Sequence, residues 1–202
     1  LKKENSPTIV KRRFLDSVSK NKVLGVYTIN DDKMRFKEEK KLNKILNKMI
    51  PKFDLVIVSD YGHGFISRKT ANLICNKSKY LALNAQVNAA NVGYHSMRNY
   101  KNVNCVIINE KEIRHELRDK NSNIEFLMKK LSKQQNIKNL IVTQGTAGSI
   151  LYNLRLNRYD RCEAFAKKTV DKIGAGDAML SLISICLNKK MDNNLSMLVS
   201  SL

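Results

Sequence analysis

The sequence predicts an α/β fold in which helices flank a mainly parallel central sheet. Short apolar runs alternate with longer segments whose apolar residues recur every three or four positions. These are the patterns of buried strands and of amphipathic helices. Their order, strand, helix, strand, strand, helix, strand, is typical of a parallel sheet covered by helices. Most of the apolar runs end in polar segments, and such sheets bind their ligands beyond the carboxyl ends of the strands.

Residues 1–33 differ from the rest of the chain. Residues 8–15 and 23–29 are short β-prone runs separated by Ser-Lys-Asn-Lys, which favours an antiparallel pair. We expect residues 1–33 to form a lid or edge strands and residues 34–202 to form an α/β nucleotide-binding core. Lys11 and Arg13 alternate on the first strand and therefore share a face. That face either contacts a substrate phosphate or is simply solvated.

The predicted core begins with a helical pattern over residues 34–50, which Pro51 ends. Ser67 is a suitable N-cap for a helix that reaches Lys77. Strands are expected at residues 54–59, 80–83, 103–108, 140–142 and 149–152. Further helices are expected from Lys111, over 124–131, over 174–187 and from Asn193. No internal repeat or domain boundary is evident.

The composition is that of a globular domain. The chain has 202 residues, of which 43% are apolar, with only two prolines and eight glycines. That is enough for one domain with a core, and it leaves no low-complexity linker. There is no run long enough to span a membrane and no signal-peptide pattern. The four cysteines form no Cys-x-x-Cys pair, which argues against zinc and predicts reduced thiols in the cytoplasm.

The formal net charge of +19 has two explanations. A strong positive field attracts nucleic acid, but it also arises when an ordinary enzyme surface is rich in lysine. The lysines are spread through every segment, and aromatic residues make up only 6% of the chain. A nucleic-acid platform would interleave aromatic and basic residues, so we expect no specific nucleic-acid partner.

One segment carries a chemical signal, the run Gly-Ala-Gly-Asp from Gly174 to Asp177. It precedes an apolar helix pattern, and the first N–H groups of a helix have no intrahelical partner. Small residues there let a phosphate approach, so Gly174, Ala175 and Gly176 are candidates for an anion hole. Asp177 lies beside it and could accept the proton of an attacking hydroxyl. A glycine-rich loop before an ordinary acidic helix start fits these residues equally well.

Residues 171–178 resemble the C-terminal signature of ribokinase-like (PfkB) carbohydrate kinases. In that family the aspartate matching Asp177 is the catalytic base, and the Gly-Ala-Gly backbone is the anion hole for the γ-phosphate. The run from Asn109 to Glu112 is similar to the family's Asn-x-x-Glu, which organises magnesium and the nucleotide phosphates. Residues 143–148 are similar to the loop that lines the ATP site. In that loop the family pattern falls on Thr143, Gly145 and Gly148.

The heptose 7-phosphate kinase subgroup is the most similar. Its strand ending Val-Ser-Asp-Tyr-Gly-Lys-Gly resembles residues 58–64, with His63 in the place of the lysine. The resemblance implies that Asp60 binds a sugar hydroxyl, although an aspartate here could simply open a turn. It implies a phosphate or ATP contact for Asn84, although an asparagine here could simply form a turn, and a substrate contact for Lys11 and Arg13.

The resemblance implies a three-layer ribokinase-like fold, with residues 1–202 forming a partial kinase domain whose N-terminal part is missing. It implies transfer of the ATP γ-phosphoryl group to a sugar or sugar phosphate, with Mg²⁺ held near Glu112 through water. A homodimer and a fused or separate nucleotidylyltransferase are the partners it allows, without a membrane. Two alternatives are a catalytically incomplete remnant that binds nucleotide or a partner, and a basic nucleic-acid-binding protein.

Overall fold

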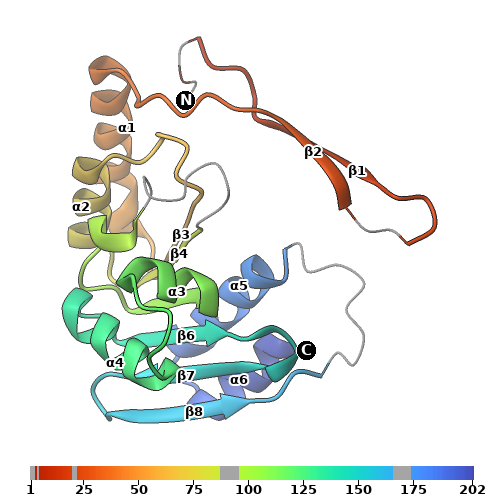
Figure 1. Cartoon of the computed structure of the whole chain (residues 1–202). Coiled ribbons are helices and arrows are strands. Elements are labelled where there is room, and N and C mark those ends of the chain that lie inside the picture. The colour runs from red at the N-terminus through yellow and green to blue at the C-terminus, as the bar shows by residue number, and fades with distance from the viewer. Residues whose placement is uncertain (1–2, 4, 20–21, 87–95, 166–173) are drawn as a thin grey trace.

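A computed structural model describes residues 3, 5–19, 22–86, 96–165 and 174–202. It shows a two-stranded ribbon beside an α/β body (Figure 1). The ribbon consists of β1 (Val10–Leu15) and β2 (Lys22–Thr28). The body contains α1 (Phe36–Met49), β3 (Val56–Asp60), α2 (Arg68–Lys77), β4 (Leu81–Ala85), β5 (Cys105–Asn109), α3 (Glu110–Leu117), α4 (Ile124–Gln135), β6 (Asn139–Thr143), β7 (Ser149–Asn153), β8 (Arg158–Cys162), α5 (Ala175–Asn188) and α6 (Asn193–Ser201). Short 3-10 turns lie at Ile50–Lys52, Met97–Asn99 and Gly145–Ala147.

The body is built on one six-stranded sheet in the order β3-β4-β5-β6-β7-β8. Strands β3 to β6 run parallel to one another, whereas β7 is antiparallel to β6 and β8 is antiparallel to β7. The predicted mainly parallel α/β fold is therefore confirmed. The carboxyl ends of β3 to β6 all meet at one edge, which is where the polar segments of the sequence follow the strands.

The central strands are buried on both faces. Successive residues point to opposite sides of a sheet, and here both sides are apolar. One side packs against α2, α3 and α4 through residues that include Leu83, Val106 and Val142. The other packs against α5 and α6 through residues that include Ala82, Ile107 and Ile141. This three-layer arrangement explains why the strands read as continuous apolar runs rather than as alternating ones.

The predicted helices are all present, with ends that differ by a few residues. Ser67 caps α2 as expected, since its Oγ accepts a hydrogen bond from the Thr70 amide at 3.1 Å. Strand β8 was not predicted. Its sequence, Arg-Tyr-Asp-Arg-Cys, is too polar to stand out as a strand, and it forms by pairing with β7 at the edge of the sheet.

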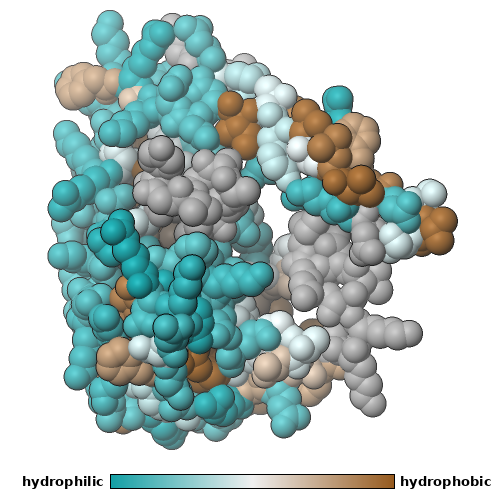
Figure 2. Space-filling view, in the orientation of Figure 1, coloured by the Kyte–Doolittle hydropathy of each residue, from teal (hydrophilic) through white to brown (hydrophobic). Residues whose placement is uncertain are grey.

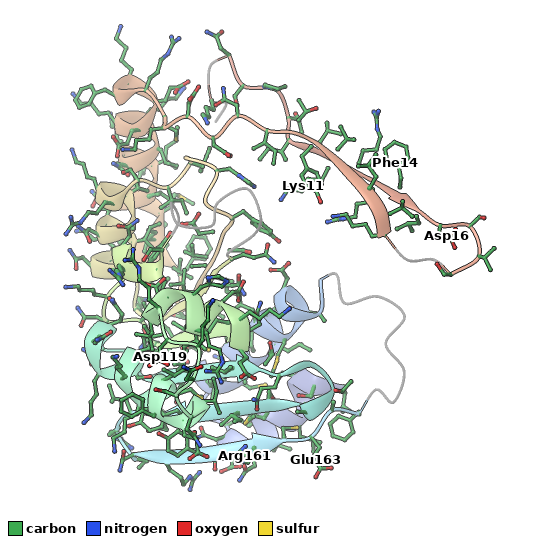
Figure 3. The ribbon with its side chains drawn as sticks, in the orientation of Figure 1. Lys11, Phe14, Asp16, Asp119, Arg161 and Glu163 are labelled. Carbon is green, nitrogen blue, oxygen red and sulfur yellow. The ribbon has the colours of Figure 1, made fainter. Side chains whose placement is uncertain are left out.

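The β1–β2 ribbon has two unlike faces. Directly paired residues share a face, and Arg12 opposite Val26 and Phe14 opposite Leu24 form a largely apolar one. Lys11 lies on the other face. Figure 3 shows Lys11 on the side toward the body and Phe14 on the side away from it. Figure 2 shows the apolar side chains that the ribbon exposes.

Within the described residues, none of the helices combines the length and the apolar character that crossing a bilayer requires.

Candidate active site

A cleft of about 2000 Å³ lies between the ribbon and the carboxyl ends of the parallel strands. Every residue predicted for the site lines it, although these residues come from segments scattered over most of the chain. The tertiary fold therefore brings the whole predicted set together. These residues are Lys11, Arg13, Asp60, Asn84, Asn109, Glu112, Thr143, Gly145, Gly148, Gly174, Ala175, Gly176 and Asp177.

The start of α5 presents open backbone N–H groups. Gly174 is the N-cap, with a φ of 83° that favours glycine, and the first intrahelical bond runs from the Ala178 amide to the Gly174 carbonyl at 2.9 Å. The amides of Ala175, Gly176 and Asp177 precede that bond and have no intrahelical acceptor. A Cβ built on Gly174 or Gly176 would meet no atom within 4 Å. The described residues therefore leave open space beside Gly174 and Gly176, and this helix start lines the cleft, as an anion site requires. Residues 171–173 of the signature lie outside the described residues.

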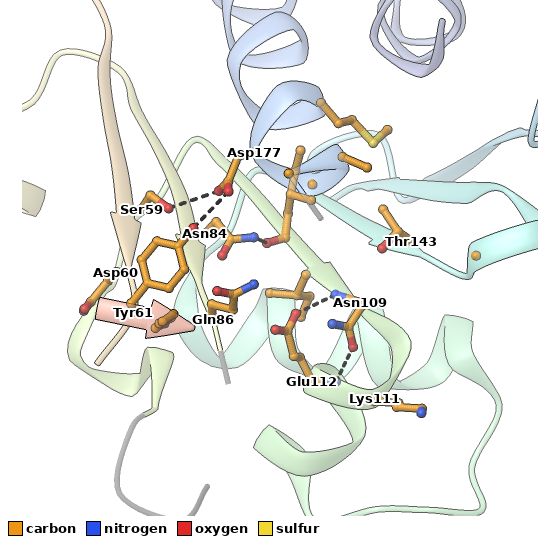
Figure 4. Close-up of a pocket in the computed structure, with 18 of the residues that line it drawn as sticks. Ser59, Asp60, Tyr61, Asn84, Gln86, Asn109, Lys111, Glu112, Thr143 and Asp177 are labelled. Atoms are coloured by element: carbon orange, nitrogen blue, oxygen red, sulfur yellow. Dashed lines mark hydrogen bonds between the residues drawn. The ribbon is translucent and has the colours of Figure 1, made fainter. Parts of the chain in front are cut away.

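Two hydroxyl groups from the end of β3 hold the Asp177 carboxylate (Figure 4). Ser59 Oγ donates to Oδ1 at 3.2 Å, and Tyr61 Oη donates to Oδ2 at 2.9 Å. Asp177 is half-buried, so its carboxylate still borders the cleft. Burial raises the pKa of Tyr61, and the hydrogen bond to Asp177 and the charge of its carboxylate raise it further.

Neither hydroxyl was assigned a role from the sequence. Ser59 and Tyr61 flank Asp60, and the period of two along an extended strand places them on the face opposite to it. This alternation is the signal in the sequence that Ser59 and Tyr61 share a face. What the sequence does not show is that Asp177, more than a hundred residues away along the chain, lies on that face.

Asp60 itself is occupied by protein partners. Its Oδ1 accepts the Gly62 amide at 2.9 Å and its Oδ2 accepts Tyr100 Oη at 2.7 Å, and only 7% of the residue is exposed. Burial raises the pKa of Tyr100, and the charge of Asp60 raises it further. These contacts favour the turn-forming interpretation, and a sugar contact for Asp60 stays a prediction.

The Asn109-x-x-Glu112 motif forms a capping box at the start of α3. Asn109 Oδ1 accepts the Glu112 amide at 2.9 Å, and Glu112 Oε2 accepts the Asn109 amide at 2.8 Å. These reciprocal bonds satisfy two helix-start donors. The motif therefore sets the beginning of the helix, and the same arrangement places both side chains at the edge of the cleft.

The other predicted nucleotide contacts also have structural partners. Asn84 Nδ2 donates to the Ile107 carbonyl at 3.1 Å, which ties β4 to β5. Thr143 ends β6, and a tight turn with positive φ at Gly145 (62°) and Gly148 (86°) follows it. A Cβ on Gly148 would lie 2.1 Å from the Cys162 carbonyl oxygen, so only glycine fits there.

A hydrogen bond that the sequence did not suggest joins this turn to α3. Gln144 Nε2 donates to Glu110 Oε2 at 2.9 Å, and Arg114 Nη2 lies 2.7 Å from Glu110 Oε1. The Gln144 hydrogen bond lowers the pKa of Glu110, and Arg114 lowers it further. The two segments predicted to line the nucleotide site are thereby held together.

The described residues contain no group of three or more His, Cys, Asp or Glu that could hold a metal ion. The described donors are compatible with Mg²⁺, which usually keeps several waters and is carried by substrate phosphates. Glu112 is 6% exposed at the cleft, and its contact with such an ion through water stays a prediction.

Known proteins share both the sequence pattern and the fold. Bifunctional protein HldE of Campylobacter jejuni (strain RM1221) is 26% identical over 157 residues, covering 76% of this chain and 33% of that protein. Bifunctional protein HldE of Campylobacter curvus (strain 525.92) is 29% identical over 157 residues, covering 76% of this chain and 32% of that protein. The chain thus spans about a third of the length of these curated relatives.

Solved structures confirm the ribokinase-like fold. A putative ribokinase from Agrobacterium tumefaciens matches with a TM-score of 0.69 at 13% identity, covering 98% of this chain and 60% of that one. Phosphofructokinase-2 from Escherichia coli in complex with potassium matches with a TM-score of 0.68 at 10% identity, covering 88% and 58%. The sequence model of the pfkB family carbohydrate kinase matches residues 3–195. Because that match takes in nearly all of the sequence, the chain belongs to the pfkB family of carbohydrate kinases.

Proposed function

We propose that the protein transfers the γ-phosphoryl group of ATP to a hydroxyl of a sugar phosphate, with Asp177 as the general base. One observation carries the proposal: a carboxylate on the cleft lies in the first turn of a helix that begins at the cleft and whose leading amides have no intrahelical acceptor. A base and an anion site are thus adjacent, as phosphoryl transfer requires.

In the proposed reaction the acceptor hydroxyl gives its proton to Asp177 as its oxygen bonds to the γ-phosphorus. The bond between the γ-phosphorus and the bridging oxygen breaks, and ADP leaves. The amides of Ala175, Gly176 and Asp177 donate to the oxygens on which charge develops. Mg²⁺ would neutralise phosphate charge, with Glu112 contacting it through water. Asn84, Asn109 and the turn from Thr143 to Gly148 would position the nucleotide.

The charges of the ribbon favour an acceptor sugar that already carries a phosphate. Lys11 and Arg13 lie on the ribbon face toward the body, and both line the cleft. These two cations could bind a phosphate on the end of the acceptor away from the reacting hydroxyl. A neutral sugar would need only hydrogen bonds to its hydroxyl groups. Heptose 7-phosphate, the substrate of the subgroup that the sequence resembles, is the first acceptor to test.

The test is Asp177→Asn, assayed by ADP release with ATP and a panel of sugar phosphates. Loss of the base should lower kcat by about 10² to 10⁴-fold. Asp54→Asn is the matched control, since it also removes one carboxylate, on an exposed residue outside the cleft that pairs with Lys79. Near-native turnover in Asp177→Asn would refute the assignment. Tight ATP binding without turnover by the native protein would favour the incomplete remnant instead.

A further inference from the structure

The ribbon and the proposed base are joined by a short chain of contacts. Lys11 Nζ lies 5.1 Å from the centroid of the Tyr61 ring, within the range of a cation–π interaction. The hydroxyl of the same tyrosine donates to Asp177. Tyr61 therefore touches the ribbon with its ring and the proposed base with its hydroxyl.

The loop that carries Tyr61 also packs against the segment that follows the ribbon. His63 Nδ1 lies 2.7 Å from Asp31 Oδ1, and the Met34 amide donates to the Gly64 carbonyl at 3.2 Å. A Cβ on Gly64 would lie 2.2 Å from the Asp32 carbonyl oxygen, so the two backbones are in close contact. A change in how the ribbon sits over the cleft would reach this loop directly.

We infer that Tyr61 is a positioning residue for Asp177, and that Lys11 couples the seating of the β1–β2 ribbon to the orientation of that carboxylate. The inference rests on the proposed function, since it gives Tyr61 a role through the base. Lys11 is also a group proposed to bind the acceptor phosphate. Binding of an acceptor to Lys11 would therefore affect Asp177 through the Tyr61 side chain. Asp177 would then be best oriented when an acceptor is bound.

The first test is Tyr61→Phe, which keeps the ring under Lys11 and removes only the hydroxyl. A hydrogen bond to a charged group is worth roughly tenfold or more in rate if it acts in the transition state. We expect kcat to fall about tenfold, with the KM values for ATP and acceptor within about twofold, because ground-state binding is untouched. Tyr159→Phe is the control. It removes a comparable hydroxyl, which donates to the Glu125 carbonyl at 2.8 Å outside the cleft, and should leave kcat unchanged.

The second test is a double-mutant cycle with Lys11→Met. In the native background this change should lower kcat about two- to fivefold, the scale of a cation–π contact, and should also raise the acceptor KM. In the Tyr61→Phe background the effect on kcat should disappear while the effect on KM remains. Equal kcat effects in both backgrounds would overturn the coupling through Tyr61. A native kcat in Tyr61→Phe would overturn the positioning role itself.

A third measurement needs no turnover. Labelling the tyrosine ring carbons lets the ionisation of Tyr61 be followed by NMR, with the Tyr61→Phe spectrum identifying its signal among seven tyrosines. Asp177→Asn should lower the Tyr61 pKa, because it removes the charge and weakens the hydrogen bond that raise it. An unchanged titration would show that the contact does not exist. If Asp177→Asn stays active the proposed function fails, whereas an inactive Asp177→Asn beside a fully active Tyr61→Phe refutes only this inference.

Discussion

Gly176 allows stability and catalysis to be separated in one substitution. It lies in the first turn of α5, and a Cβ built on it would meet no atom within 4 Å. Alanine is favoured over glycine in a helix by up to about 1 kcal/mol. Gly176→Ala should therefore leave the free energy of unfolding unchanged or raise it by up to that amount, with no steric penalty.

The open space around Gly176 is the same space that the proposed γ-phosphate needs. A methyl group would push the phosphate outward, and a displacement of about 1 Å can cost roughly 100-fold in rate. We expect kcat/KM for ATP to fall on the order of 10- to 100-fold while stability holds. Urea unfolding followed by circular dichroism gives the stability, and ADP release gives the rate.

Gly174→Ala is the matched control for stability. Its Cβ would also enter open space, but the φ of 83° puts alanine in the left-handed region, at a cost of about 1 to 2 kcal/mol. Gly174→Ala should thus lower the free energy of unfolding, whereas Gly176→Ala should not. A Gly176→Ala protein with native kcat/KM for ATP would refute the idea that a phosphate group sits against these amides.

Two further outcomes are expected. Gly148→Ala should lower the free energy of unfolding by about 2 to 5 kcal/mol, because left-handed strain and overpacking against the Cys162 carbonyl add. Urea unfolding measures this loss. A loss no larger than that of Gly174→Ala would show that β8 can shift to make room for the methyl group. Glu110 has a pKa below its usual 4.5 because of Gln144 and then Arg114, so its contribution to stability is full above about pH 4.5 and is lost as the pH falls through the lower folded pKa. Glu110→Gln should therefore flatten the loss of stability in this acid range, as measured by urea unfolding at several pH values, and an equally steep loss would contradict the role of Glu110.

The sequence alone was sufficient for most of the secondary structure and for the chemical motif. Continuous apolar runs and a period of about 3.6 residues are local properties, so they predicted β3 to β7, α1 and α2 to within a few residues. The run from Gly174 to Asp177 predicted a helix start with open amides, because small residues and their backbone conformation are also local. Its resemblance to a kinase signature then supplied the expected chemistry.

Tertiary structure decided what lies between distant segments. Strand β8 forms because its backbone pairs with the edge of β7. Residues 158–162 have too little apolar pattern for the strand to be predicted from the sequence. The resemblance implies that the Asn109-x-x-Glu112 motif organises magnesium and the nucleotide phosphates, which stays a prediction, and the structure shows the motif as a capping box at the start of α3.

The hydroxyl contacts of Asp177 show the limit most clearly. Tyr61 and Asp177 are 116 positions apart, and no local pattern relates them. They meet because β3 and α5 pack in adjacent layers, and β3 ends where α5 begins, at the carboxyl edge of the sheet. The sequence by itself named the proposed base, and only the packing of these layers determined which side chains hold it, because such contacts depend on the fold and not on neighbouring residues.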